Sequence, residues 1–492
     1  MIAPRLANDT LATLRASEAL SLPSGPVPTA TGIVHLGIGA FHRAHQAIMT
    51  ADAAAATGDS RWGIYGVSLR SADVKAQLAP QDGLYGAMTL APSSTSIRIV
   101  DAVRLVGFAG EDSLAVLRQL AADDTHIVTL TITEKGYTSS PGLEADLHSL
   151  ASDLAGRHLE DSDAVRSAVG LLVRGLAHRF RTRAPVSIVS CDNLVTNGAV
   201  TRSVVFAAAR AAHASDGFLE WLDTGVSFPS TMVDRIVPAT TSQHRRLAEQ
   251  LTGLSDRGLV VAEPFSQWIV ADDFRTPRPL WELGGATIIS DVRPFETLKL
   301  RTLNAAHSMV AYLGSLLGHL TIADAVEDPR IQDAARGLID VDVAPTLDLP
   351  PGVSLEDYRD QVLERFANPR IGHTTRQVAM DGSVKLPERV MRTIAERLET
   401  GVVPRYATLL LASWMVFIER SAARGDSSQS LQDPRADELL GAVAGDSAGI
   451  ADRFLDLDGI FPVIAREHPA FRDGLRAAVA ELRAGATSIV RR

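Results

Sequence analysis

The sequence has 492 residues, of which 46% are hydrophobic and 22% charged, with a formal net charge of −10 at pH 7. The length favours two domains over a single core, and the acidic balance excludes the basic face that nucleic-acid binding requires. No apolar run approaches the roughly 18 residues of a membrane span, the N-terminal segment lacks an apolar signal core, and the single cysteine, Cys191, excludes an internal disulfide and a multi-cysteine metal site. We therefore expect a cytoplasmic protein with neither a membrane nor a nucleic-acid partner.

The first half of the chain alternates predicted strands and helices. A short apolar strand runs into a glycine turn within residues 32–41, and a helix is predicted over residues 44–57. The remaining predicted strands span residues 62–69, 97–106, 126–133 and 186–190, and the remaining helices span residues 114–122 and 167–181. Strands that alternate with helices are typical of a parallel sheet with crossover helices. We predict an α/β domain over residues 1–285.

The second half has a different pattern. After a last strand-like segment at residues 287–290 the β signal fades, and from residue 295 onward the apolar residues recur with the 3.6-residue period of helices. Proline and glycine interrupt this pattern near residues 341–352 and 401–404. We predict a mainly α-helical domain over residues 286–492.

A glycine turn follows the first strand of the α/β domain. Gly37-x-Gly39 lies between a strand and a helix, where small residues let the backbone approach a pyrophosphate at a helix N-terminus. His42 takes the place of the third glycine, so the motif alone equally suits a turn that binds no nucleotide. After the second strand come Arg70 and Asp73. The acid would hold the ribose hydroxyls of NAD, whereas the arginine would suit the 2′-phosphate of NADP.

Lysine is rare in this chain, because only Lys75, Lys135, Lys299 and Lys385 stand among 48 lysines and arginines. A lysine can give up its proton, which arginine cannot do in a protein. At 100° per residue, Lys299, Asn304 and His307 fall within an arc of about 140° on a helix and can face one cleft. A desolvated lysine can act as a base and an asparagine can donate to a developing alkoxide. An amphipathic helix with a solvated lysine remains the alternative.

Two further segments carry polar residues next to predicted strands. Ser190–Asn193 directly follows a strand, where sheet proteins place ligand-contacting loops. Residues 228–235 (FPSTMVDR) suit a buried ion pair as well as a site. Neither segment decides the function alone.

Six segments occur in order along the chain: IVHLGIGAFHRAHQA, TLTITEKGY, SCDN, FPSTMVDRIVPAT, EPFSQWIVADDF and KLRTLNAAHS. With them the chain resembles the polyol-specific long-chain dehydrogenases, the family of mannitol 2-dehydrogenase and fructuronate (D-mannonate) reductase. The resemblance is strong over residues 32–390 and loose beyond. It implies an N-terminal Rossmann-type domain, a mainly helical C-terminal domain, and a site between them.

The resemblance also implies a metal-free mechanism. It assigns Lys299 as the general base, Asn193 and Asn304 as hydrogen-bonding partners of the substrate oxygen, and His307 as a substrate-orienting residue. It assigns Asp234 and Glu296 as acids that help proton exchange. Cofactor-binding positions are Gly37, Ile38, Gly39, Ala40, Phe41, Arg70, Asp73, Thr131 and Glu134, and the implied cofactor is NAD, with NADP possible.

Substrate choice divides this family. Mannitol dehydrogenases carry glycine in place of Lys135 and arginine in place of Gln377, whereas fructuronate reductases resemble this chain at both positions and at His373. Lys135, His373 and Lys385 would suit a carboxylate better than a neutral polyol terminus. We therefore predict reduction of D-fructuronate to D-mannonate, with Lys135, His373, Gln377 and Lys385 as substrate-binding residues.

Three alternatives remain open. One is a polyol 2-dehydrogenase that acts on mannitol, sorbitol or arabinitol. Another is a non-catalytic nucleotide-binding regulator, which would have no need of Lys299. A zinc alcohol dehydrogenase is disfavoured by the single cysteine and the lack of closely spaced histidines. The expected partner is a small sugar acid or polyol, and a monomer is the default expectation.

Overall fold

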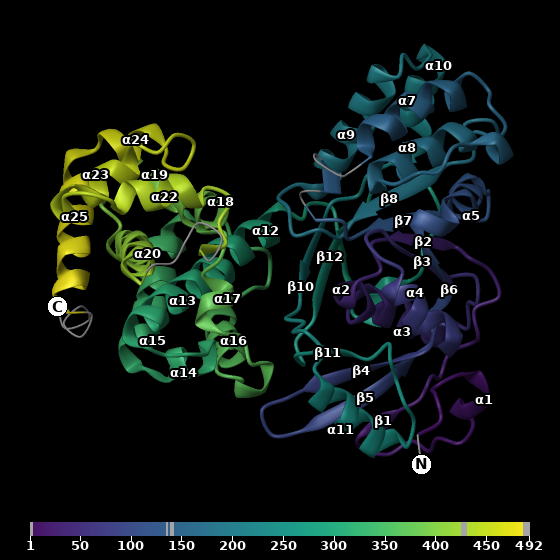
Figure 1. Ribbon diagram of the computed structural model, residues 1–492, viewed down its shortest axis with the longest axis horizontal. Helices are drawn as coiled ribbons and strands as arrows, with labels where there is room; N and C mark the ends of the chain where they lie inside the picture. Colours follow the sequence, from purple (N-terminus) through teal and green to yellow (C-terminus); the bar gives the residue numbers. More distant parts are fainter. Residues whose placement is uncertain (1–2, 134–135, 138–141, 425–430, 486–492) are drawn as a thin grey trace. The chain divides into compact units, whose positions relative to one another are not determined.

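The computed structural model describes residues 3–133, 136–137, 142–424 and 431–485. The chain forms two units, Met1–Arg293 and Pro294–Arg492 (Figure 1). Among the described residues, no helix is long and apolar enough to cross a membrane.

A six-stranded parallel sheet is the centre of unit 1. Its order is β6-β3-β2-β7-β8-β9. The strands are β2 (Ile33–Leu36), β3 (Ile64–Ser68), β6 (Val103–Phe108), β7 (Ile127–Leu130), β8 (Val186–Ser190) and β9 (Val226–Ser227). Numbered within the sheet this is the order 3-2-1-4-5-6 of dinucleotide-binding folds, in which the ligand crevice lies where the order reverses. In this chain the order reverses between β2 and β7, so the sequence-based prediction of a Rossmann-type domain is confirmed.

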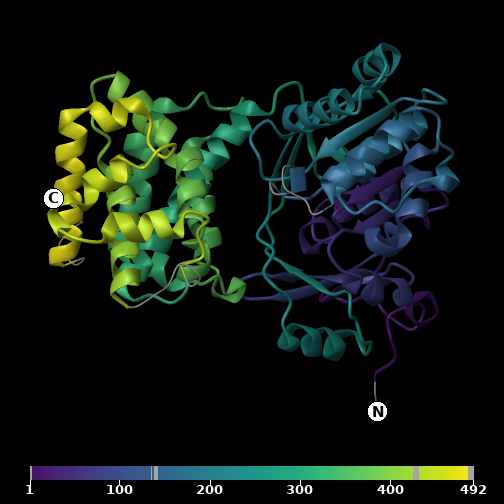
Figure 2. The same ribbon diagram turned by 45° about the horizontal axis from the view of Figure 1, so that its top comes forward.

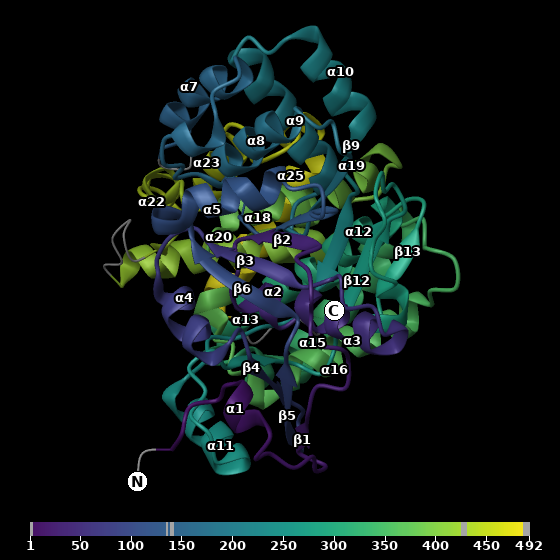
Figure 3. The same ribbon diagram turned by 90° about the vertical axis from the view of Figure 1, so that its right-hand side faces the viewer.

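Both faces of this sheet are buried, which explains why its strands are apolar on both sides. In the paired strands β2 and β7, Ile33 and Ile127 face one core, whereas Val34 and Val128 face the other. Figures 1 and 3 show the helices on the two sides. One side carries α5 (Ala109–Ala121), α7 (Leu143–Leu154), α8 (Ala168–Arg179), α9 (Asn197–Ala211) and α10 (Asp216–Gly225), and the other carries α2 (Ala40–Arg43), α3 (Gln46–Thr57) and α4 (Asp73–Leu78).

Two smaller sheets complete unit 1, and the sequence pattern did not predict them as sheets. One has the order β1-β5-β4-β11 and is flanked by α11 (Ser242–Thr252) and α1 (Asn8–Leu11) (Figure 2). The other has the order β10-β12-β13. Their strands are β1 (Leu20–Ser21), β4 (Tyr85–Leu90), β5 (Thr95–Val100), β11 (Val260–Ala262), β10 (Thr231–Asp234), β12 (Gln267–Ala271) and β13 (Thr287–Ile289).

One predicted strand was wrong in an instructive way. Residues 97–106 are not continuous, because the chain leaves β5 at Val100 and enters β6 at Val103. β5 pairs antiparallel with β4, whereas β6 pairs parallel with β3 in the central sheet. The apolar alternation runs through both strands, so periodicity alone could not locate the change of sheet.

Unit 2 is helical, and its described residues contain no strand, which confirms the predicted class. Its α-helices are α12 (Arg293–Lys299), α13 (Ala305–Leu317), α14 (Ile322–Glu327), α15 (Pro329–Gly337), α16 (Leu355–Phe366), α17 (Thr375–Val378), α18 (Gly382–Leu386), α19 (Arg392–Glu399), α20 (Arg405–Ala423), α22 (Ala436–Val443), α23 (Ile450–Leu455), α24 (Val463–Glu467) and α25 (Pro469–Ala484). Three π-helical turns interrupt them: η4 (Leu300–Asn304), η5 (Leu338–Val343) and η8 (Pro387–Met391).

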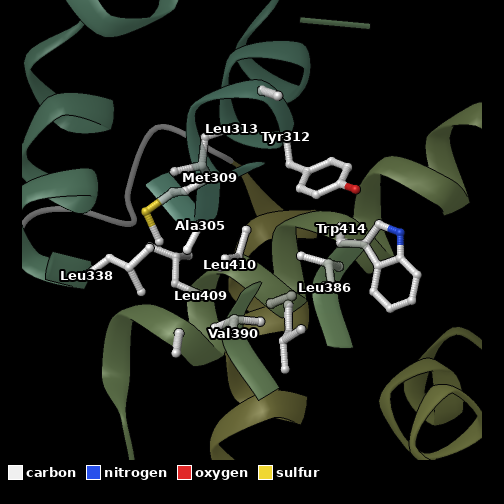
Figure 4. Close-up of a cluster of buried hydrophobic side chains, with 14 of the residues drawn as sticks. Ala305, Met309, Tyr312, Leu313, Leu338, Leu386, Val390, Leu409, Leu410 and Trp414 are labelled. Atoms are coloured by element: carbon white, nitrogen blue, oxygen red, sulfur yellow. The ribbon is translucent and has the colours of Figure 1, made fainter. Parts of the chain in front are cut away.

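The core of unit 2 forms around α13 and α20. Met309 and Tyr312 from α13 pack with Leu410 and Trp414 from α20, and Val390 joins them from η8 (Figure 4). Residues 409–418 of α20 are buried throughout, which accounts for the most apolar run in the sequence. This core fixes one side of α13 and so orients the residues at its N-terminal end.

Candidate functional site

The glycine turn lies at the carboxyl end of β2, at the point where the strand order reverses. Gly37 has φ +102°, and a Cβ there would lie 2.1 Å from the carbonyl oxygen of Thr131, so only glycine fits. A Cβ at Gly39 would meet nothing nearer than the Gly37 oxygen at 3.7 Å. The backbone of Gly39 is thus open to a ligand. Ile38 is buried, and Phe41 stacks on His45 with ring centroids 5.0 Å apart.

A stacked pair of histidines, His35 and His42, packs against this turn and takes the place of the third glycine of the motif. The ring of His42 stacks on that of His35 in β2, with centroids 3.4 Å apart. The Thr131 hydroxyl donates to the Gly37 carbonyl (2.8 Å), so the His35 Nε2–H donates to Thr131 (3.0 Å), while Nδ1 accepts from Thr129 (2.8 Å). An imidazole stack therefore replaces the close helix–strand contact that a third glycine would allow.

Burial keeps both imidazoles neutral. It lowers the pKa of His35 to about 3 and that of His42 well below 6.5. The unfolded chain takes up these protons near pH 6.5, so the free energy of unfolding should fall as pH decreases through 6.5 and level off below about 3 for His35. At pH 5 the expected loss from His35 is about 2 kcal/mol. Urea denaturation of wild type and His35→Gln at pH 7 and pH 5 measures this, and an equal loss in both proteins would contradict it.

A buried carboxylate anchors the loops that follow β7 and β8. Asp192 accepts from the backbone N–H groups of Ile132 (3.2 Å) and Thr133 (2.7 Å) and from the Tyr137 hydroxyl (2.9 Å). Burial raises the pKa of the Asp192 carboxyl, and these hydrogen bonds oppose the rise. Sequence reasoning missed Asp192 and Tyr137 as supporting residues, although an acid directly after a buried strand was the available signal.

The other predicted residues of unit 1 are placed as follows. Asn193 is exposed directly after Asp192, and Asp234 is buried at the end of β10. Burial raises the pKa of the Cys191 thiol, which leaves that side chain unreactive. Arg70 and Asp73 are both exposed after β3, and Asp73 accepts from the Ser71 hydroxyl at 2.8 Å. Glu134 and Lys135 lie outside the described residues.

In unit 2, the helix that carries Lys299 is not a uniform α-helix. α12 ends at Lys299, and the π turn η4 connects it to α13. A π turn holds about one residue more than an α turn, so residues beyond it rotate back by roughly 100°. His307, which would lie about 80° from Lys299 on an α-helix, then lies within roughly 20° of it. The arc of about 140° predicted for Lys299, Asn304 and His307 assumed a regular α-helix. The π turn brings these three residues into a narrower arc.

The side chains along this helix are buried. Lys299 is 7% exposed, Glu296 5% and Asn304 6%. Glu296 precedes Lys299 by three residues and therefore lies on the same helix face. Within the described parts of the chain, Nδ2 of Asn304 and Nε2 of His307 are buried without a hydrogen-bond partner. Such donors and acceptors are costly unless a ligand or water completes them.

Cationic and aromatic groups surround His307. Its ring stacks on the rings of Phe366 and His373, with centroid-to-centroid distances of 4.7 Å and 6.2 Å. Burial lowers the pKa of His307, and the charges of Arg389, His373, Lys385 and Arg365 lower it further. Burial also lowers the pKa of His373. The histidine is therefore neutral at physiological pH and can accept a hydrogen bond.

The two predicted substrate-binding residues Lys385 and Gln377 differ in their charge and in their hydrogen bonds within the protein. Burial and the neighbouring Arg389 lower the pKa of Lys385 to about 8, and its Nζ donates to the Met380 carbonyl at 2.7 Å. The Gln377 side-chain oxygen accepts from the backbone N–H and the hydroxyl of Thr374, both at 3.1 Å, and so caps α17. Gln377 therefore already has a structural task, and its substrate role stays a prediction.

Two other features of the described residues bear on the site. They contain no group of three or more histidines, cysteines or acids that could hold a metal ion. A cavity of about 650 Å³ in unit 2 contains none of the predicted site residues; it is lined by Asp333, Ala334, Gly337, Asp340, Val341, Arg405, Tyr406, Leu409, Ala478 and Glu481.

Comparisons with known proteins match both units. Residues 31–283 match the mannitol dehydrogenase Rossmann domain, and residues 291–481 match the mannitol dehydrogenase C-terminal domain. The chain is 37% identical to a D-mannonate oxidoreductase of Escherichia coli, over 91% of this chain and 92% of that protein. It is 36% identical to a mannitol dehydrogenase of Saccharomyces cerevisiae, over 85% and 84% respectively.

A solved structure is similar over the whole length. The mannitol 2-dehydrogenase of Pseudomonas fluorescens, in a ternary complex with NAD and D-mannitol, matches with a TM-score of 0.83 and 33% identity, over 99% of each chain. The two domain matches together span most of the sequence in the order that its motifs predict. The chain therefore belongs to the mannitol dehydrogenase family of oxidoreductases.

Proposed function

We propose that this protein is an NAD-dependent secondary-alcohol dehydrogenase that interconverts a sugar-acid ketone and its alcohol, D-fructuronate and D-mannonate. This proposal rests mainly on the buried polar residues Glu296, Lys299 and Asn304, and on the π turn, which brings the half-buried His307 to the same helix face as Lys299. A regulator would have no use for a buried lysine there. The mannonate assignment is also supported by the relative of that name.

The glycine turn fits a dinucleotide. Gly37 allows the tight turn, Gly39 leaves its backbone open, and both lie where the strand order reverses. Ala40, Phe41 and Thr131 would complete this contact, and Asp73 would hold the ribose hydroxyls. A bound nicotinamide would supply the site that accepts a hydride from the alcohol carbon in oxidation and donates it to the ketone in reduction. We expect NADH to be preferred, because Asp73 repels a 2′-phosphate, although Arg70 lies nearby.

The residues of the chain then handle the proton and the oxygen. Lys299 Nζ takes the hydroxyl proton during oxidation and returns it during reduction, and no metal ion is required. The unpaired Nδ2 of Asn304 donates to the substrate oxygen, and Asn193 has the corresponding role in unit 1. His307 accepts from a substrate hydroxyl through Nε2. Glu296 and Asp234 exchange the proton with solvent.

The cationic residues near His307 favour an acid over a neutral polyol. Lys385 and His373 are charged or can donate, and a carboxylate gains charge-assisted hydrogen bonds from such groups. Each is worth about 1.5–3 kcal/mol, or roughly 10- to 100-fold in kcat/KM. Lys135 would add to this preference. The competing candidate is a polyol dehydrogenase, which the mannitol-oxidising relatives favour.

We expect D-fructuronate to be reduced with a kcat/KM at least about 10-fold above that for D-fructose. Lys385→Met should erode this ratio, and so should a rise in pH through about 8, where Lys385 loses its charge. Lys75→Met is the matched control, because Lys75 is engaged with Glu111 (3.0 Å) and Asp112 (2.7 Å). Kinetics on both substrates with NADH and NADPH test these points. Fructose outperforming fructuronate would favour the polyol reading, and a preference for NADPH would remove Asp73 from the ribose site.

A further inference from the structure

An arginine outside the predicted site binds the junction between the π turn and α13. Nη1 of Arg389 donates to the carbonyl of Asn304 (3.1 Å) and to the hydroxyl of Ser308 (2.9 Å). The Ser308 hydroxyl in turn donates to the same Asn304 carbonyl (3.2 Å). Asn304 and Ser308 are buried, at 6% and 2% exposed. The guanidinium of Arg389 therefore holds the backbone of Asn304, the residue whose side-chain Nδ2 is buried without a hydrogen-bond partner.

Arg389 is itself held by a second π turn. It belongs to η8, which begins at Pro387 in the continuous helical stretch from α18 to α19. Proline lacks an N–H donor and its ring crowds the preceding turn, so a wider turn accommodates it. Val390 and Met391 of η8 are buried in the core of unit 2. Arg389 thus extends from a fixed backbone to the catalytic helix.

The charge of Arg389 acts on the same helix. Its pKa is lowered by burial to about 10, so it stays charged at neutral pH. Burial lowers the pKa of His307 most, and neighbouring groups lower it further, in decreasing order Arg389, His373 before α17, Lys385 on α18 and Arg365 on α16. Among these neighbours, Arg389 therefore contributes most to the neutral state that His307 needs as a hydrogen-bond acceptor.

We propose that Arg389 is a positioning residue, which fixes the π turn so that the Asn304 amide and the His307 ring are held for the substrate. This inference rests on the proposed function, because it gives Asn304 and His307 substrate contacts. Arg389 reaches the reaction only through those two residues. Its loss should therefore lower turnover much more than it weakens cofactor binding.

The test compares three variants with matched chemistry. Arg389→Met removes the donors and the charge, and Arg389→Lys keeps the charge and one donor. The control is Arg420→Met, because Nη1 of Arg420 donates to the Leu316 carbonyl (2.8 Å) at the far end of the same helix α13. We would measure kcat and KM with whichever ketone the wild type reduces faster, NADH affinity, and thermal stability. A substrate-free readout is the titration of His307 by NMR, assigned through His307→Asn.

We expect Arg389→Met to lower kcat by roughly 10- to 100-fold with little change in NADH affinity. Arg389→Lys should recover most of this loss, and Arg420→Met should keep a wild-type kcat even if it is less stable. The His307 titration should move to higher pH in Arg389→Met alone. If the wild type turns over neither ketone, the proposed function fails, and the titration still decides the role of Arg389. A wild-type kcat in Arg389→Met, or an unshifted titration with no recovery in Arg389→Lys, would overturn the proposal.

Discussion

Replacing Lys299 with alanine is expected to lower kcat for ketone reduction by about 10²–10⁴-fold, the usual worth of a positioned acid–base group. Lys299 is buried where α12 meets the π turn, so water has little access to replace it. NADH affinity should survive, because the proposed nucleotide contacts lie in unit 1. Steady-state kinetics and a fluorescence titration with NADH separate the two effects.

Three controls test whether the expected loss is specific to Lys299. Lys75→Ala should retain activity, because that lysine pairs with Glu111 and Asp112. A small primary amine added to Lys299→Ala should restore part of the rate, since it can occupy the vacated space and carry the proton. Prolonged treatment of the wild type with a chelator should leave activity unchanged. Near-wild-type turnover of Lys299→Ala would remove the lysine from the mechanism, and zinc-reversible inactivation would overturn the metal-free mechanism.

Gly37→Ala is expected to weaken NADH binding by more than about 10²-fold and to destabilise the protein. The residue has φ +102°, and a Cβ would lie 2.1 Å from the Thr131 carbonyl oxygen. That oxygen belongs to the segment directly after β7 and cannot retreat without disturbing the sheet. Strain of this kind costs on the order of 1–3 kcal/mol before the steric clash is added. Calorimetric titration with NADH and thermal unfolding measure the two losses.

Gly58→Ala is the control that separates the steric clash of a Cβ from the strain of a positive φ. Gly58 also has a positive φ, +70°, but a Cβ there would meet nothing within 4 Å. Its substitution should cost about 1 kcal/mol of stability and leave NADH affinity unchanged. An equal loss of NADH affinity in Gly37→Ala and Gly58→Ala would mean that the close approach of Gly37 to Thr131 has no role in the proposed cofactor site.

The central sheet could be predicted because its strands are apolar on both faces and are separated by turns and helices. The predicted span of β8, residues 186–190, is the observed one, and α8 was predicted to within two residues at its C-terminal end. The small sheets were missed because β10, β11 and β12 are three to five residues long and find their partners far away in the sequence. Such short strands depend on tertiary pairing more than on their own periodicity.

The candidate site was predictable where a residue type is rare and less so where geometry matters. Lys299 stood out because lysine is scarce, and Gly37 because of its place between strand and helix. The π turn after Lys299 could not be predicted, because nothing in the Leu300–Asn304 segment distinguishes it from an α-helix. Arg389 was likewise hidden among many arginines, and only its contact with Asn304 distinguishes it.

The π turn after Lys299 means that the alignment of Lys299 with His307 depends on the number of residues between them as well as on their identity. Deleting one residue from Leu300–Asn304 would restore an ordinary helix and turn everything beyond it by roughly 100° relative to Lys299. The same deletion would also turn the apolar face of α13 away from α20. The extra residue of this turn is therefore difficult to remove, because the hydrophobic packing of α13 and the proposed site depend on the same helical register.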